Sequence, residues 1–267
     1  MVRPGGERSD ERWRQLLVGH AAAVVRKRAP LVERTSWGWM LHAPELPRVW
    51  ALNRAQIVPG AGGLAPDAVV ADLLEHHRRR GLSHVAVDVR ADGDVPALAP
   101  ALARAGLVVA GLEVLVADPA TLADEAVAPA SVAVAAEPPE AARGLRHAGS
   151  ADLPEPERSE VAAQWSPAGD AQTLHLLARD DAGTPVGAAV LHLASLHVEL
   201  DDVLTHPAHR RAGVGTAIVG AAAAIARDRG AGAVGLLSDP GSSAAGWYRR
   251  LGFVRVGPAV SAVRAAD

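Results

Sequence analysis

The stretch that decides the fold is Val203-Leu204-Thr205-His206-Pro207-Ala208-His209-Arg210-Arg211-Ala212-Gly213-Val214-Gly215-Thr216. A strand predicted over Leu196–Thr205 leads into a turn with two glycines, and the turn opens a helix predicted over Gly213–Arg229. The glycines let a ligand approach the backbone closely. The first turn of a helix leaves amide groups without intrahelical partners, and the helix dipole adds positive potential there. With two arginines beside it, the stretch predicts an anion site.

This loop is not a nucleotide-binding loop of the common kinds. No Gly-Lys-Ser/Thr follows the glycines, so a Walker loop with its lysine and magnesium-binding hydroxyl is excluded. The pattern is also not Gly-x-Gly-x-x-Gly. What remains is Arg210-x-x-Gly213-x-Gly215 between an apolar strand and a long helix, a pattern that by itself fits several anionic ligands.

A second motif lies close to the C-terminal end. Tyrosine and phenylalanine each occur once in the chain, and both fall in Trp247-Tyr248-Arg249-Arg250-Leu251-Gly252-Phe253. A strand is predicted over Ala233–Leu237, between the loop and this motif, and a helix over Ser242–Arg250.

The two motifs together resemble the GNAT superfamily of N-acetyltransferases. The resemblance rests on Arg210-x-x-Gly213-x-Gly215 and Ala244-x-x-Trp247-Tyr248-x-x-x-Gly252-Phe253, and it covers roughly residues 130–265. It implies an α/β fold of the α+β type, with a central mixed sheet flanked by helices. It also implies acetyl-CoA as co-substrate, bound between two splayed parallel strands, here Leu196–Thr205 and Ala233–Leu237.

The resemblance assigns the CoA-binding residues one by one, and no metal is expected. Backbone groups of Val203, Leu204 and Thr205 are expected to pair with the pantetheine arm. The family often has an asparagine seven residues before the tyrosine, where this chain has Gly241. Ser242 or Ser243 is expected to take over that contact, and Ser242 is assigned to the CoA-binding residues. Amides of the loop and first helical turn are expected to hold the pyrophosphate: Arg210, Arg211, Ala212, Gly213, Val214, Gly215 and Thr216.

The implied chemistry is direct attack of an amine on the thioester, which needs a proton acceptor and a proton donor. Tyr248 stands where the family places its proton-donating tyrosine. Strand alternation puts His197, Glu199 and Asp201 on one face, and a pair of close carboxylates favours a raised pKa for one of them. Glu199 is the first candidate for the base and Asp201 the second. His206 and His209 flank the loop and are not expected to be catalytic.

A weak internal repeat predicts two domains. The unit of helix, glycine, strand, short helix, glycine and strand occurs through Gly81 and Gly106, and again through Gly230 and Gly252. The prediction is a degenerate GNAT-like domain over residues 1–120, a linker over 121–130 and a catalytic GNAT domain over 131–267. The first copy has Val58-Pro59-Gly60-Ala61-Gly62-Gly63 in place of the arginine–glycine loop, and Leu102 in place of the tyrosine.

Composition limits the class of protein further. The 267 residues carry a net charge of −3, which argues against a duplex-DNA partner. Cysteine is absent, so thiolate nucleophiles, disulfides and cysteine-based zinc sites are excluded. The polar N-terminal sequence predicts no signal peptide, and no apolar run is long enough to cross a bilayer, so a cytoplasmic protein without a membrane partner is expected. The basic runs His76–Arg80 and Arg26–Arg28 are interpreted as solvated helix faces.

The function predicted from these features is transfer of an acetyl group from acetyl-CoA to a primary amine of a small molecule. Two alternatives stay open: a non-catalytic acyl-CoA-binding module and a protein N-acetyltransferase. The acceptor depends on the loops after Leu145 and around Trp165, which sequence reasoning does not shape. A monomer and a homodimer are equally compatible with the sequence.

Overall fold

A computed structural model describes residues 7–58, 63–89, 95–126, 129, 131–165 and 172–265. The chain forms two compact units, each built from separate stretches of sequence. Unit 1 comprises Met1–Leu17 and Glu113–Gly257, and unit 2 comprises Val18–Leu112 and Pro258–Asp267.

Unit 1 contains a mixed sheet in the order β5-β10-β9-β8-β7-β6. Every neighbouring pair is antiparallel except β9 and β10, which run parallel. Its strands are β5 (Val108–Ala117), β6 (Val132–Ala136), β7 (Thr173–Asp180), β8 (Pro185–Leu193), β9 (Val198–Thr205) and β10 (Val234–Ser238). Its helices are α4 (Pro119–Glu125), η2 (Pro139–Ala142), α5 (Arg143–Gly149), α6 (Glu157–Ala163), η3 (Pro207–His209), α7 (Val214–Asp228) and α8 (Ser243–Arg250).

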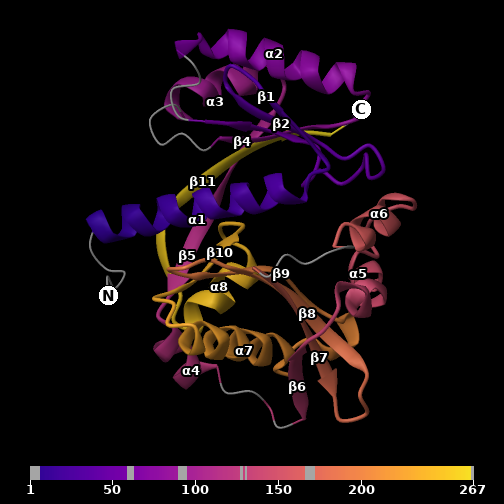
Figure 1. Ribbon diagram of the computed structural model, residues 1–267, viewed down its shortest axis with the longest axis vertical. Coiled ribbons are helices and arrows are strands. Elements are labelled where there is room, and N and C mark those ends of the chain that lie inside the picture. The colour runs from indigo at the N-terminus through magenta and orange to yellow at the C-terminus, as the bar shows by residue number, and fades with distance from the viewer. Residues whose placement is uncertain are drawn as a thin grey trace. The chain divides into compact units, whose positions relative to one another are not determined.

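The two faces of this sheet have different cores. On one face, the apolar stripe of α7 packs against alternate residues of the strands, among them Val198 and Leu200 of β9. On the other face, Ala142 and Leu145 pack against Leu177 of β7. Figure 1 shows α7 along one side of the strands and α5 and α6 on the other. The predicted mixed sheet flanked by helices is confirmed.

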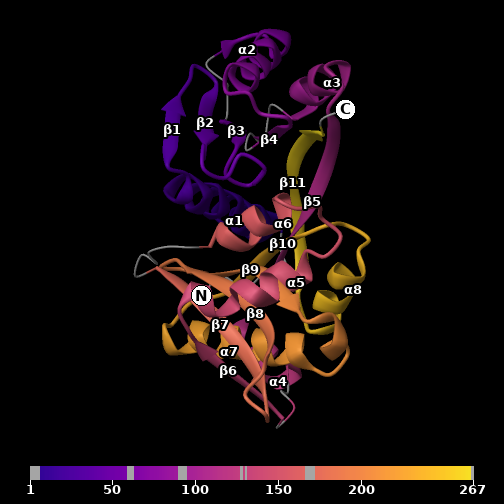
Figure 2. The ribbon, with the colours of Figure 1, turned by 90° about the vertical axis from the view of Figure 1, so that its right-hand side faces the viewer.

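Unit 2 repeats this plan with the strand order β1-β2-β3-β4-β11. Only β3 and β4 run parallel in it. Figure 2 shows β1, β2, β3 and β4 side by side. The remaining strands and helices are β1 (Leu31–Arg34), β2 (Gly38–His42), β3 (Arg54–Ile57), β4 (Val85–Val89), β11 (Val254–Arg264), α2 (Pro66–Arg79) and α3 (Val95–Arg104), while α1 (Glu7–Arg28) contributes to both units.

From β1 in the first half and from β7 in the second, the elements follow in a similar order. Both halves run through three strands, a helix, a strand, a short helix and a last strand. The repeat glycines all have positive φ, between 63° and 95°. At each of them the following amide bonds back to the fifth carbonyl before it, as Phe253 does to Tyr248 at 3.1 Å. These are Schellman helix ends, which glycine favours.

The last strand of each half lies in the other half's unit. Strand β5 follows α3 in sequence, but its residues Glu113–Ala117 pair with β10 in unit 1. Strand β11 follows α8, but its residues Val260–Arg264 pair with β4 in unit 2. The compact units are therefore not the continuous ranges 1–120 and 131–267, and a tandem origin of the two halves stays a prediction.

The segment expected as a linker contains a helix that is part of the core. Asp118 caps α4 by accepting a hydrogen bond from the Ala120 amide at 2.8 Å. Leu122 is completely buried in the core that includes α7. A Cβ added at Gly220 of α7 would lie 2.9 Å from the carbonyl oxygen of Ala126. The alanine and proline residues of this stretch allow close packing. Because the same residues are common in linkers, the sequence alone indicates a linker.

Other predicted elements differ mainly in extent. The sequence Val49–Ile57 favours a strand, but β3 begins only at Arg54, because turns precede it. The sequence Asp152–Trp165 favours a helix, but α6 is limited to Glu157–Ala163. Strand β1, whose four residues are all exposed, was not predicted because an edge strand without a buried face has no alternating pattern.

We expect Leu122→Ala to lower the free energy of unfolding by about 2–5 kcal/mol, since it removes a buried side chain from a packed core. Leu196→Ala is the matched control, because Leu196 lies in the same unit and is 45% exposed. Urea denaturation of both variants measures the difference. Equal stability of the two variants would show that α4 is a detachable linker.

Candidate functional site

The two parallel strands of unit 1 separate soon after they begin. Among the described residues, β9 and β10 pair only at Val198 with Val234 and at Glu199 with Gly235. In contrast, β10 pairs along its whole length with β5, and β9 pairs with β8 as far as Thr205. Each strand is thus held on its outer side while the two diverge toward their C-terminal ends. The predicted splayed pair is confirmed.

The anion site predicted after β9 lies at the start of α7. Gly213 is the N-cap residue with φ 80°, and no side chain caps the helix. The amides of the first helical turn, Val214 to Thr216, therefore point toward the end of the helix without a side-chain acceptor. Arg210 and Arg211 are exposed beside this turn. The geometry suits a phosphate group, because unpaired amides, the helix dipole and two guanidinium groups coincide.

The structure gives the two glycines of this loop a packing role that the motif did not reveal. A Cβ at Gly213 would lie 2.4 Å from Cγ of Pro129. A Cβ at Gly215 would lie 3.0 Å from Cη2 of Trp247. The loop thus packs closely against the segment before β6 and against α8. Glycine is needed here for backbone conformation and for packing, as well as for any ligand.

Tyr248 lies on α8 and is only 7% exposed. Its ring packs between Trp247, at 4.6 Å between centroids, and Phe253, at 5.4 Å. The Schellman bond from the Phe253 amide to the Tyr248 carbonyl fixes this arrangement. Burial, and next the negative charge of Asp201, raise the pKa of Tyr248 well above its usual value near 10. The phenol therefore keeps its proton at neutral pH, as a proton donor must.

The two candidate bases lie on the face of β9 opposite α7. Val198 and Leu200 point into the α7 core, so Glu199 and Asp201 point the other way, as strand alternation predicts. Glu199 is 5% exposed, whereas the side chain of Asp201 is 46% exposed. The alternation ends at Asp202, which has φ 48° where the register of β8 and β9 shifts. Such a bulge bends the strand, here where β9 has left β10.

Polar and aromatic side chains from other elements also line the face of the sheet opposite α7. The sequence predicts that the loops after Leu145 and around Trp165 matter for the acceptor, but it does not predict these contacts. Nε of Arg146 donates to Oδ2 of Asp202 at 2.7 Å, and its guanidinium lies over the ring of Trp165 at 5.4 Å. Trp165 stacks on His192, with centroids 6.1 Å apart, and meets His175 edge-on. A sequence signal existed, since His175 and His192 interrupt two otherwise apolar strands.

The remaining predicted residues lie around the splayed strands. Val203, Leu204 and Thr205 form the half-buried end of β9 beyond its pairing with β10. Ser242 is the N-cap of α8, where its Oγ accepts a hydrogen bond from the Ala245 amide at 3.0 Å. The structure thus gives Ser242 a helix-capping role, and its contact with CoA stays a prediction.

Unit 2 lacks a corresponding opening in the part of the chain that the structure describes. Strands β3 and β4 pair through to their ends, from Ala55 with Val87 to Ile57 with Val89. Nη1 of Arg54 also donates to both carboxylate oxygens of Asp88, at 2.6 and 2.7 Å, across the two strands. Leu102, the counterpart of Tyr248, is a fully buried core residue. Residues 59–62 of the predicted loop counterpart lie outside the described residues.

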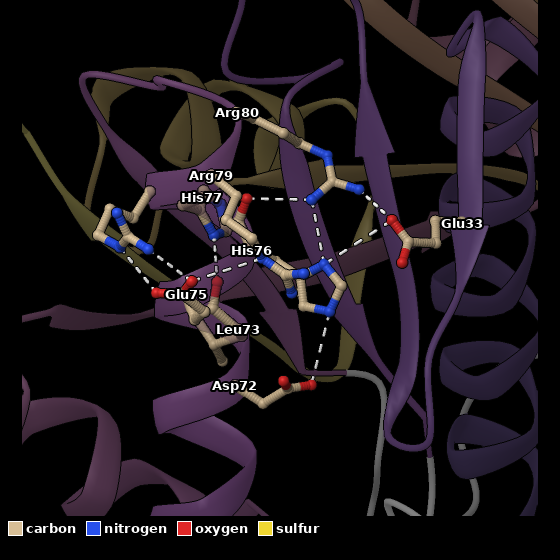
Figure 3. A network of polar contacts seen from close by, with 9 residues as sticks. Glu33, Asp72, Leu73, Glu75, His76, His77, Arg79 and Arg80 are labelled. Atoms are coloured by element: carbon tan, nitrogen blue, oxygen red, sulfur yellow. Dashed lines mark hydrogen bonds and ion pairs between the residues drawn. The ribbon is translucent and has the colours of Figure 1, made fainter.

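The basic run at the end of α2 is only partly a solvated face. His76 and His77 are buried, and burial lowers the pKa of His77 to about 4. Arg80 donates to Nδ1 of His76 at 3.0 Å and pairs with Glu33 of β1 (Figure 3). The interpretation as a solvated face was wrong for the two histidines, because helical spacing turns them toward the sheet. The network joins α2 to β1 and has a structural role.

The region around the splayed strands matches a known protein family. The model of the acetyltransferase (GNAT) family matches residues 142–253. The match covers less than half of the chain and shows that this region is similar to GNAT acetyltransferases. The matched region includes the opening, the α7 N-terminus, the acidic face of β9 and Tyr248. The family transfers acetyl groups from acetyl-CoA, so the similarity supports acyl transfer in general.

Solved structures share the fold over most of the chain. A GCN5-related N-acetyltransferase from Kribbella flavida is 20% identical, with a TM-score of 0.67 over 94% of this chain and 95% of that chain. A conserved protein of unknown function from Staphylococcus epidermidis is 16% identical, with a TM-score of 0.68 over 88% and 93%. A tandem GNAT protein from the clavulanic acid biosynthesis pathway is 18% identical, with a TM-score of 0.53 over 78% and 70%. A comparison with curated protein sequences returns no match.

Two searches for other kinds of site were negative. Within the described ranges, no helix is long and apolar enough to cross a membrane. The same residues contain no group of three or more histidine and acidic side chains placed to hold a metal ion.

The single tyrosine makes the state of Tyr248 measurable. We expect no tyrosinate absorbance at 295 nm in the native protein at pH 10.5, whereas the unfolded chain should ionise near pH 10. Because the folded pKa is the higher one, the stability due to the neutral phenol is fully present below about pH 10 and is lost as pH rises further. Tyr248→Phe should abolish the signal. A native midpoint at or below pH 10 would contradict the buried site.

Proposed function

We propose that the protein transfers an acetyl group from acetyl-CoA to a primary amine of a small molecule, by direct attack within a ternary complex. The observation that carries the proposal is the opening between β9 and β10, bordered by an uncapped helix N-terminus and a buried, protonated tyrosine. An anion site, an extended strand edge and a proton donor are what a CoA thioester requires.

The proposed position of acetyl-CoA follows from these elements. The pyrophosphate binds the amides from Arg210 to Thr216, with the two arginine side chains beside it. The pantetheine arm runs along Val203–Thr205, the part of β9 that has separated from β10. We assign one acetyl-CoA to each chain, since the parallel strands of unit 2 stay paired to their ends.

The proposed reaction has two proton movements. An ammonium group loses a proton to Glu199 or Asp201, and the free amine attacks the thioester carbonyl carbon. The C–N bond forms as the C–S bond breaks, and the sulfur leaves as a thiolate. The acetylated nitrogen releases its second proton to solvent as the amide forms. Tyr248 donates its proton to the thiolate and is reprotonated from solvent. The acidic face of β9 supports a cationic acceptor, because carboxylates attract an ammonium group before it loses its proton.

The two halves are proposed to differ in function. The half that carries the GNAT motifs performs the reaction, and the half with β1 to β4 is a degenerate relative without its own acetyl-CoA. A non-catalytic acyl-CoA-binding module is the second candidate, favoured by Gly241 at the position of the family's asparagine. Turnover separates the two candidates.

We expect Arg210→Glu to weaken acetyl-CoA binding about 10- to 100-fold, since charge-assisted hydrogen bonds contribute about 1.5–3 kcal/mol. Arg229→Glu is the matched control, because it makes the same charge change at the exposed C-terminal end of α7. Isothermal titration with acetyl-CoA measures both variants. Equal affinity in the two variants would remove the pyrophosphate from this loop.

Turnover is tested by CoA release in a screen of amino acids, amino sugars, polyamines and aminoglycosides. The absence of cysteine means that a thiol reagent reports only the released CoA. We expect Tyr248→Phe to lower kcat about 100-fold with little change in acetyl-CoA affinity, as for loss of a general acid. Binding without turnover of any amine would favour the binding module, and full turnover by Tyr248→Phe would exclude this acid.

A further inference from the structure

A buried histidine lies beside both candidate bases. His192 is 2% exposed and belongs to β8. It stands directly opposite Glu199 in the antiparallel register of β8 and β9. Directly opposite residues of such a pair share one face, so the imidazole is on the acidic face of the site.

The imidazole is held from three sides. Its Nε2 lies 3.5 Å from Oδ2 of Asp201, and its Nδ1 lies 3.4 Å from Oγ1 of Thr173. Its ring stacks on Trp165 at an interplanar angle of 27°. A threonine hydroxyl that donates to Nδ1 leaves the proton of a neutral imidazole on Nε2, facing Asp201. Nε2 makes no hydrogen bond within the described residues, and Asp201 faces it at ion-pair distance.

We propose that His192 is a positioning residue for acetyl transfer, which holds the Asp201 carboxylate toward the reacting amine and so makes Asp201 the base. The inference rests on the proposed function. Asp201 is open to the acceptor and to solvent, whereas Glu199 is almost fully buried. The amine gives its proton to an oxygen of Asp201, which then passes it to water.

The negative charge of Asp201 also acts on Tyr248, the proposed acid, where it is second to burial in raising the pKa of the phenol. The base and the acid therefore interact electrostatically although they belong to β9 and α8. The Asp202 amide donates to Oδ1 of Asp201 at 2.8 Å and restrains the carboxylate on one side. His192 lies beside its other oxygen, Oδ2, at 3.5 Å.

Several charged or titratable groups surround His192 and also affect the pH dependence of the rate. Glu199 and Asp201 face it from β9, and His175 lies nearby on β7. Arg146 of α5 lies across the ring of Trp165, where it pairs with Asp202. Since these groups stay in place when only residue 192 is changed, a shift of the pH profile reports on the contact with Asp201.

Two variants of His192 separate the contribution of its Nε2 nitrogen from the contribution of its aromatic ring. His192→Phe keeps an aromatic ring against Trp165 but has no nitrogen, whereas His192→Gln keeps an amide donor near the position of Nε2. The matched control is His147→Gln, because His147 also contacts a carboxylate, Glu155 at 2.6 Å, but is exposed on α5. Rates of CoA release are measured from pH 5 to 9 with the best amine of the screen.

We expect His192→Phe to lower kcat about tenfold, to change acetyl-CoA affinity less than twofold, and to move the acidic limb of kcat/KM to higher pH. The limb moves up because a carboxylate that loses a nearby imidazole N–H group or imidazolium charge is protonated more easily. His192→Gln should restore kcat to within about threefold of wild type, and the control should match wild type.

Three outcomes would overturn the inference while the wild type remains active: an unchanged acidic limb in His192→Phe, failure of His192→Gln to restore kcat, or full activity of Asp201→Asn. A loss confined to thermal stability would assign His192 to packing and likewise overturn it. A wild type that binds acetyl-CoA but acetylates no amine overturns the proposed function itself, and the catalytic role of His192 with it.

Discussion

The site depends on how little β9 and β10 pair with each other. In the described part of the chain they share two register positions, whereas each is paired on its other side along most of its length. Backbone hydrogen-bonding groups in a sheet normally find partners, so strands that diverge leave an edge that an extended ligand can occupy. The bulge at Asp202 bends β9 where this edge begins. The uncapped start of α7 follows the end of that strand after the short helix η3.

The opening is stabilised by sequence that lies outside the matched GNAT region. One of its strands, β10, is paired throughout with β5, which the N-terminal half supplies. In unit 2, the parallel pair β3–β4 stays closed and is crossed by the ion pair of Arg54 with Asp88. The same topology therefore gives an open strand pair in one unit and a closed pair in the other. Exchange of the last strands makes each unit depend on residues of both halves.

Sequence reasoning succeeded where the determining interactions are local. The loop before α7 and the glycine that ends α8 are set by residues within one turn, so motif spacing located them. It failed for α4, because alanine and proline are equally suited to a linker and to a tightly packed helix. It also did not assemble the wall of Arg146, Trp165 and His192, whose members come from separate elements. The pairing of β7, β8 and β9 brings these residues together, and the register of that pairing cannot be read from a single sequence.

The proposed acid and base are coupled through a single charge. Burial, and next the Asp201 carboxylate, disfavour ionisation of Tyr248 by raising the pKa of its phenol. When Asp201 accepts the proton of the amine, its charge is neutralised and its effect on the phenol ends. Tyr248 then becomes a stronger acid at the stage when the thiolate leaves. In the proposed reaction, burial keeps the phenol a weak acid throughout, and protonation of Asp201 removes only the smaller, electrostatic part of the effect.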